Sequence, residues 1–174
     1  MRHKLERWCM PLFPRLRASR AVRVMDRLHK LAPPRVASAL LRTWFNGWCT
    51  RRRFQGSGSC IFGCAYGKDS VEHYSACSRL HSYGRQQLRP RDPGEPGLRT
   101  QCFMLLEASS TYTDELLVRR ALLLTAAYKL HCRLRRSPPF TETEVLWRAL
   151  DQAIKEAAQG HSRAIQVLTT TWLR

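Results

Sequence analysis

Three cysteines and one histidine lie close together in the stretch CIFGCAYGKDSVEHYSAC, residues 60–77, with the spacing Cys60-x3-Cys64-x8-His73-x3-Cys77. Thiolate and imidazole groups at short spacings are the usual ligands of a tetrahedral zinc ion. Four protein ligands fill the coordination sphere of such an ion and leave no position at which water could be activated. The spacing therefore predicts a closed Cys3His site whose Zn2+ is structural and performs no reaction.

The residues between these ligands indicate how the four side chains come together. Asp69 is a candidate N-cap, and Glu72 follows it three residues later, which predicts the start of a helix. On that helix His73 and Cys77 would be four residues apart, so their side chains would project from one face. Gly63 allows a tight turn between the first two cysteines.

Two alternatives to this ligand set stay open at this point. His81 lies four residues beyond Cys77 on the same expected helical face, and it could replace a ligand or serve as an outer donor. A cluster of buried thiols with a neighbouring histidine, and no metal at all, would show the same spacing.

Helical periodicity dominates the rest of the chain, and no convincing strand alternation appears outside the cysteine cluster. Helices are predicted over residues 15–31, 35–55, 115–136 and 162–173, and one more follows TETE at 141–144. The predicted fold class is all-α: a helical domain with a small Cys3His zinc knuckle inserted between the N- and C-terminal helices.

Prolines and glycines suggest how the chain is divided. RPRDPGEPG, residues 89–97, contains three prolines and two glycines and is typical of a linker. The predicted segments are a basic amphipathic N-terminal segment (1–34), a helix plus zinc-finger module (35–88), a Pro/Gly linker (89–100) and a C-terminal helical domain (101–174).

Positive charge is the strongest indication of a partner. Thirty Lys and Arg residues against thirteen Asp and Glu residues give a net charge of +17, which favours a polyanion such as nucleic acid. The segment TRRRFQ, residues 50–55, places arginines and an aromatic ring directly before the cysteines; arginine binds phosphate and stacks on bases. We predict RNA or single-stranded DNA as the partner, held mainly through phosphates. The predicted nucleic-acid-binding residues are Arg51, Arg52, Arg53, Arg79, Arg85, Trp48 and Phe54.

The location of the protein is less constrained. The longest uncharged apolar run in the second half, ALLLTAAY at 121–128, is far shorter than the ~20 residues of a transmembrane helix, and no membrane span is expected. The odd number of cysteines, without a secretory segment, favours a reducing compartment, either nuclear or cytoplasmic. The arginine-rich, acid-poor segment 15–31 is also typical of a mitochondrial presequence, so that location stays open.

The segments RTWFNGWCTRRRFQ, CIFGC and DSVEHYSAC together resemble the C-terminal zinc-finger region of non-LTR (LINE-type) retrotransposon reverse transcriptases. In that family a helical segment with a tryptophan and a basic end leads into a zinc-binding finger. The resemblance covers about residues 36–80 and places Cys60, Cys64, His73 and Cys77 at the ligand positions. The gap between histidine and cysteine is one residue shorter than in the commonest form. The resemblance implies a nucleic-acid-binding finger derived from the tail of such an enzyme.

No catalytic centre is expected. The polymerase of that family needs paired palm aspartates for two metal ions, and the aspartates of this chain are never adjacent. No palm-length region precedes the finger, and the endonuclease is missing as well. The motifs HExxH and GxSxG, a phosphate-binding glycine loop and the zinc deaminase motifs do not occur either. We therefore predict no enzyme activity and no small-molecule substrate.

The sequence is compatible with three candidate functions. The favoured one is a non-catalytic nucleic-acid-binding protein with a structural zinc finger, derived from a reverse transcriptase tail. The second is a structural subunit of a large RNA assembly such as an organellar ribosome. The third is a zinc-stabilised protein-interaction module, which would have a protein partner.

Overall fold

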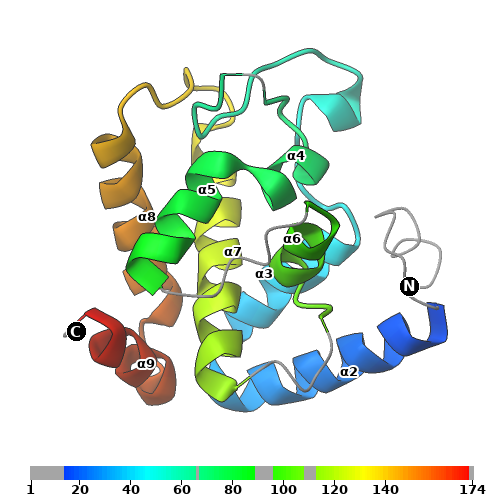
Figure 1. Ribbon diagram of the computed structural model, residues 1–174, viewed down its shortest axis with the longest axis vertical. Coiled ribbons are helices and arrows are strands. Elements are labelled where there is room, and N and C mark those ends of the chain that lie inside the picture. The colour runs from blue at the N-terminus through cyan, green and yellow to red at the C-terminus, as the bar shows by residue number, and fades with distance from the viewer. Residues whose placement is uncertain (1–13, 66, 89–95, 108–112, 173–174) are drawn as a thin grey trace.

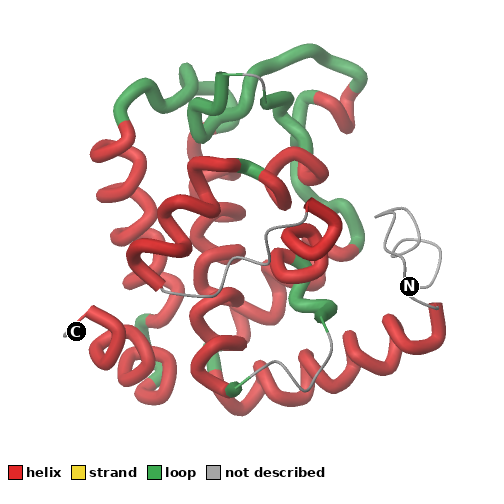
Figure 2. Tube along the Cα trace, viewed as in Figure 1, coloured by secondary structure: helices red, strands yellow, loops and turns green. Residues whose placement is uncertain are grey.

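The computed structural model describes residues 14–65, 67–88, 96–107 and 113–172. Helices make up most of these residues, and no β-strand occurs among them (Figure 2). Ser59 and Lys68 form one isolated antiparallel bridge. The predicted all-α class is therefore confirmed for the described part of the chain.

The α-helices are α2 (Pro14–Leu31), α3 (Pro34–Trp44), α4 (Val71–Ala76), α5 (Ser78–Tyr83), α6 (Pro96–Phe103), α7 (Asp114–Leu134), α8 (Thr143–Ala158) and α9 (Ser162–Trp172). A 3-10 turn, η1 (Arg52–Phe54), precedes the cysteines, and a short π-helical segment, η2 (Gly84–Leu88), follows α5.

Helix α7 runs through the middle of the molecule, and α2, α3, α6, α8 and α9 all contact it (Figure 1). The hydroxyl of Thr113 caps this helix by accepting a hydrogen bond from the backbone N–H of Leu116, and two acidic residues in the first turn suit the helix dipole. Most of its apolar side chains are buried, on several sides of the helix. This burial on several sides is typical of a helix at the centre of a helical domain.

Helix α3 is shorter than predicted, because the chain leaves the helix after Trp44. Asn46 adopts a positive φ of 54°, and its N–H donates to the carbonyl of Thr43 while the N–H of Gly47 donates to the carbonyl of Arg42. This pair of bonds is the Schellman ending, in which a residue in the left-handed region stops a helix. The predicted helix over residues 35–55 is therefore wrong beyond residue 44.

One continuous core includes buried side chains from the N-terminal segment, the finger and the C-terminal helices. Trp48 lies within this core, fully buried. Its ring centroid is 5.5 Å from that of Tyr74, 5.4 Å from that of Tyr128 and 5.3 Å from that of His131. Tyr74 belongs to α4, whereas the other two rings belong to α7. The finger and the helical body are thus packed as one unit.

Only part of the predicted linker, residues 89–100, lies among the residues that the structure describes. Residues 89–95 lie outside the described residues, as does the beginning of the predicted N-terminal segment, residues 1–13. The last part of the predicted linker is not a linker, because residues 96–100 form the beginning of α6.

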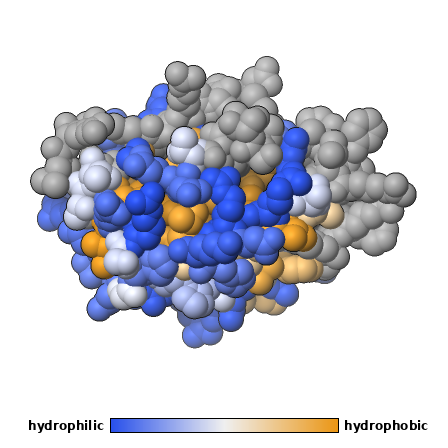
Figure 3. Space-filling view, turned by 90° about the horizontal axis from the view of Figure 1, so that it is seen from below, coloured by the Kyte–Doolittle hydropathy of each residue, from blue (hydrophilic) through white to orange (hydrophobic). Residues whose placement is uncertain are grey.

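Seen from the end that carries α2 and α9, the molecule is mainly hydrophilic with small hydrophobic areas (Figure 3). Among the described residues, no helix combines the length and the hydropathy that crossing a membrane requires.

Candidate metal centre

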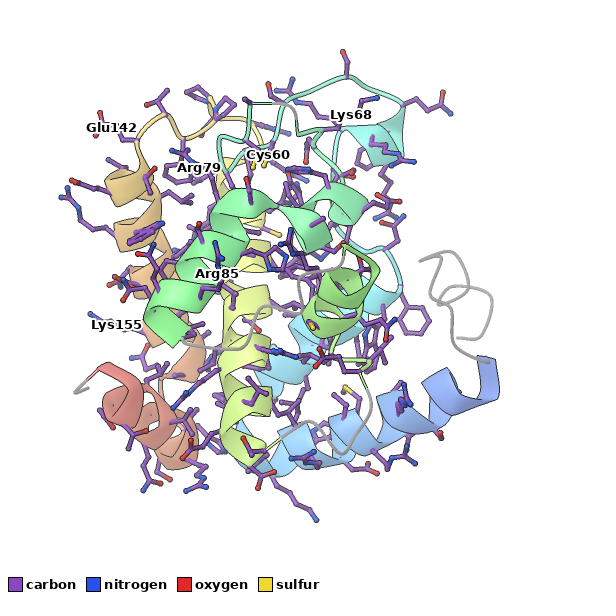
Figure 4. The ribbon with its side chains drawn as sticks, viewed as in Figure 1. Cys60, Lys68, Arg79, Arg85, Glu142 and Lys155 are labelled. Atoms are coloured by element: carbon purple, nitrogen blue, oxygen red, sulfur yellow. The ribbon has the colours of Figure 1, made fainter. Side chains whose placement is uncertain are left out.

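Cys60, Cys64, His73 and Cys77 meet at the end of the molecule where the loops before α4 lie (Figure 4). Their ligand atoms all lie within 4.8 Å of one another. The Sγ atom of Cys77 is 3.9 Å from that of Cys60 and 3.1 Å from that of Cys64. Tetrahedral zinc with Zn–S bonds of about 2.3 Å separates its sulfurs by about 3.8 Å. The group could therefore hold a metal ion after a small outward movement of Cys64.

Backbone hydrogen bonds shape the loop that carries the first two ligands. The N–H of Cys60 donates to the carbonyl of Gly67 at 2.7 Å, and the N–H of Gly63 donates to the carbonyl of Cys60 at 3.0 Å. Gly63 has a φ of +82°, a conformation that glycine adopts without strain. The tight turn expected at this residue is confirmed.

The other two ligands are positioned differently from the prediction. Ser70 is the N-cap of α4, because its hydroxyl accepts a hydrogen bond from the N–H of His73 at 3.0 Å. Helix α4 ends at Ala76, and Cys77 lies in extended backbone between α4 and α5. His73 and Cys77 therefore do not share one continuous helical face, and Asp69 is not the cap. A bend at Cys77 brings its sulfur to the site instead.

The ring of His73 lies against Gly67, in a space that any side chain at that position would fill. A Cβ atom on Gly67 would lie 2.2 Å from Nε2 of His73 and 2.8 Å from Cβ of Cys60. This Nε2 atom is buried and has no hydrogen-bond partner among the described residues. Buried polar atoms are rarely left unpaired, and the ring of His73 lies beside the thiols of Cys60 and Cys64, so His73 fits the position of a metal ligand.

The crowded thiols have unequal acidities. Hydrogen bonding to Cys77 lowers the pKa of Cys60 to about 6 and that of Cys64 to about 4, while the same two contacts raise the pKa of Cys77. Backbone N–H groups of Cys64, Arg79 and Leu80 also face the sulfurs of Cys60, Cys64 and Cys77, respectively, and favour thiolates there. Metals bind the thiolate form, so this environment suits metal binding.

His81 is not part of the ligand group. Its Nε2 atom lies 2.8 Å from the carbonyl oxygen of Ser75. The structure thus favours Cys77 over His81 as the fourth member of the set.

Asp69 has a role that the sequence did not reveal. Its buried carboxylate accepts hydrogen bonds from the N–H of Arg51 at 2.8 Å and from the hydroxyl of Tyr74, and it lies 3.3 Å from Nε2 of His131. Burial alone would raise the pKa of Asp69, but hydrogen bonds from His131 and Tyr74 lower it. The carboxylate thereby connects the segment before the cysteines, α4 and α7.

Two of the predicted nucleic-acid contacts need correction. Trp48 is fully buried, and its indole N–H donates to the hydroxyl of Thr43 at 2.9 Å, so no ring face is open to a base. Arg79 is used inside the protein. Its guanidinium donates to the carbonyls of Phe62, Phe140 and Thr141 and to the hydroxyl of Thr143, at 2.8–3.0 Å.

These bonds of Arg79 also explain how α8 begins. The segment TETE has the pattern of a capping box, but none is formed, since Glu142 is the N-cap and makes no side-chain capping bond. The hydroxyl of Thr143 instead accepts from Arg79, and the loop between α7 and α8 is held against the finger (Figure 4).

The other predicted contacts remain on the surface. Arg51, Arg52 and Arg53 are exposed at η1, and Phe54 beside them is 67% exposed. Arg85 is exposed on η2, away from η1 (Figure 4). The structure therefore brings the arginines of η1 and Phe54 together, next to the metal-ligand group.

Comparison with known proteins gives no relative. No protein-family model, no curated protein and no solved structure matches the chain.

Proposed function

We propose that this chain is a non-catalytic protein that binds RNA or single-stranded nucleic acid, and that a structural zinc ion shapes its binding surface. The observation that carries the proposal is the exposed cluster of Arg51, Arg52, Arg53 and Phe54 beside the Cys3His group. We call this cluster the η1 surface. The net charge of +17 supports a polyanionic partner.

The side chains of the η1 surface suit a flexible strand. The guanidinium carbon of Arg53 lies 5.8 Å from the ring centroid of Phe54, which leaves much of the ring open to a base. Arg52 is 3.6 Å from Glu72, but both side chains are partly exposed, and such pairs hold an arginine only weakly. Stacking on an aromatic ring combined with arginine contacts to phosphate is the usual way to bind single strands without sequence preference.

Zinc is the metal that best fits the ligand set. Three thiolates and one imidazole in a tetrahedral arrangement are typical of structural zinc sites, and four protein ligands leave no open position for catalysis. A bound Zn2+ would offset two of the three thiolate charges and connect the loop around Cys60 to α4. The chain's own contribution is to place the ligands: Gly67 makes room for His73, and Asp69 holds the backbone of Arg51.

The origin of the protein is part of the proposal. The resemblance of residues 36–80 to the finger of LINE-type reverse transcriptases supports descent from such a tail. A nuclear or cytoplasmic location, where thiols stay reduced, is compatible with zinc-bound cysteines.

Salt dependence of binding tests the proposal. We expect the zinc-loaded full chain to bind single-stranded RNA with an affinity that falls steeply as salt rises, measured by mobility shift. The variant Arg52→Ala/Arg53→Ala should reduce the slope of log K against log salt by about 0.7 for each phosphate that it no longer binds.

The matched control is Arg23→Ala/Arg163→Ala, which removes the same charge from exposed positions on α2 and α9, at the opposite end of the molecule (Figure 1). This control should keep the wild-type slope. Binding that is absent or insensitive to salt would overturn the proposed function, and equal effects of the two variants would remove the η1 surface from it.

A further inference from the structure

A small pocket lies between the finger and the loop that joins α7 to α8. It has a volume of about 160 Å³. Its lining consists of Arg51, Ser59, Ile61, Arg135, Arg136, Ser137, Pro138 and Pro139. Two segments far apart in the sequence thus form its walls, at the end of the molecule where these loops lie side by side (Figure 1).

Several contacts fix the walls of this pocket. The N–H of Phe140 donates to the carbonyl of Ile61 at 3.0 Å and joins the two segments. The backbone of Arg51 is held by the buried carboxylate of Asp69. A Cβ atom on Gly58 would lie 2.3 Å from Cδ of Arg51, so the stem of this arginine runs closely along the glycine. Pro138 and Pro139 restrict the backbone of the opposite wall.

The charge of the lining is entirely positive. Three guanidinium groups, from Arg51, Arg135 and Arg136, border the pocket, and no carboxylate does. None of the three has an acidic partner among the described residues, whereas Arg133 close by pairs with Glu156 at 2.6 Å. Like charges around one small space repel each other, and a bound anion removes that cost.

The end of α7 opposes an anion here, as does the carboxylate of Asp69 that holds the backbone of Arg51. The C-terminus of a helix carries about half a negative charge, and α7 ends at Leu134, just before two of the arginines. Three full positive charges outweigh this partial charge and the single charge of the carboxylate. Each guanidinium also presents several N–H groups in a plane that matches the oxygens of phosphate.

The volume of the pocket limits the size of the ligand. A volume of 160 Å³ holds roughly five water molecules at ~30 Å³ each. Sites for drug-sized ligands are larger, about 300–1,000 Å³. The pocket therefore suits one tetrahedral oxyanion, with hydroxyls of Ser59 and Ser137 at its edge, and not a whole nucleoside.

We propose that this pocket binds one phosphate group of a nucleic-acid strand. The inference rests on the proposed function and adds to it a defined anchoring point, separate from Arg52, Arg53 and Phe54 of the η1 surface. Because Ser59 and Ile61 flank the ligand Cys60, metal binding and phosphate binding share one wall.

The variant Arg135→Ala/Arg136→Ala tests the pocket, with Arg23→Ala/Arg163→Ala as the control of equal charge. In the zinc-loaded full chain we expect RNA affinity at low salt to fall at least about 10-fold, and the salt slope to fall by about 0.7 for the one phosphate that is no longer bound. The control should keep the wild-type slope. An RNA with a 5′-phosphate is compared with the same RNA ending in a 5′-hydroxyl. An equal decrease for both assigns the pocket to an internal phosphate, and a larger decrease for the first assigns it to the strand end.

A second measurement separates the pocket from the proposed function. Inorganic phosphate is titrated into the wild type while the backbone amide signals of Ser59 and Ser137 are followed by NMR. Saturable shifts that disappear in Arg135→Ala/Arg136→Ala support the pocket even where RNA does not bind. An unchanged RNA salt slope in this variant overturns the pocket and leaves the proposed function standing. No RNA binding by the wild type, together with no phosphate shifts, overturns both.

Discussion

Gly67→Ala tests the metal centre at its narrowest point. The new Cβ would lie 2.2 Å from Nε2 and 2.4 Å from Cε1 of His73, whereas ordinary contact begins at 3.4 Å. The ring would therefore have to retreat by about 1.2 Å (3.4 − 2.2). Metal–ligand distances tolerate only about 0.2 Å, so His73 would leave the coordination sphere. We expect metal affinity to fall by at least about 100-fold, because the loss of a ligand exceeds the loss of an outer partner.

Cobalt binding measures this effect directly. Tetrahedral Co2+ with thiolate ligands absorbs visible light, and a titration gives both the affinity and the ligand geometry. Gly56→Ala is the matched control, because its Cβ would meet no atom closer than 3.5 Å. Urea denaturation of each metal-free variant shows whether the fold survives.

A double-mutant cycle with His73→Ala gives the decisive comparison. Gly67→Ala acts mainly by displacing the ring but also crowds Cβ of Cys60 at 2.8 Å, so it should cause a much smaller further loss of metal affinity once the ring is gone. A wild-type cobalt spectrum and affinity in Gly67→Ala would refute the reasoning. Full additivity of the two substitutions would refute it as well.

Three further predictions concern the surroundings of the site. Arg79→Ala should lower the unfolding free energy by about 2–4 kcal/mol, because the guanidinium serves four acceptors, and Arg79→Lys should restore little of it in urea denaturation. Trp48→Phe should cost about 1–2 kcal/mol through its lost hydrogen bond and leave RNA affinity unchanged in a mobility-shift assay. Hydrogen bonds from Arg133 and Lys129 lower the pKa of Glu156 from 4.5 to about 2, so its contribution to stability is complete above pH 4.5 and is lost as the pH falls through 2. Glu156→Gln should remove this part of the acid dependence in thermal melts. An unchanged denaturation curve of Arg79→Ala would contradict the first prediction, and weakened RNA binding by Trp48→Phe would contradict the second. The third would be contradicted if Glu156→Gln and the wild type lost stability over the same acid range.

The meeting of the Cys3His group could be predicted because its chemistry and its spacing are local. Cys60, Cys64, His73 and Cys77 come from one short segment, residues 60–77, and their residue types are those that bind zinc. Helical periodicity also predicts a buried stripe on α8, formed by Val145, Leu146, Ala149, Leu150, Ala153, Ile154 and Ala157. Five of these seven are buried, whereas Ala149 is half-buried and Val145 is 44% exposed.

The end of α3 was missed although the sequence contains the signal. Asn46 followed by Gly47 can adopt the positive φ that a Schellman ending requires. The helical spacing of Trp44 and Trp48 favours a longer helix and so conflicts with that signal. Both tryptophans are buried, but Trp48 reaches the core from the loop and not from the helix.

The roles of Arg79 and Asp69 could not be predicted from the sequence. The acceptors that occupy Arg79 in the α7–α8 loop lie more than sixty residues further along the chain. The partner of Asp69 in α7, His131, is 62 residues away. In the local sequence Arg79 reads as a surface arginine and Asp69 as a candidate helix cap. Their partners come close to them only in the tertiary structure.

The aromatic packing around Trp48 means that residues 35–88 do not form an independent domain. In an isolated fragment of residues 35–88, Trp48 would lose its contacts with Tyr128 and His131. Its ring, which is buried in the full chain, would then be exposed to water. If the Cys3His group holds a metal ion, removing that ion should therefore loosen the whole polypeptide and expose it to proteases, and not only release one loop.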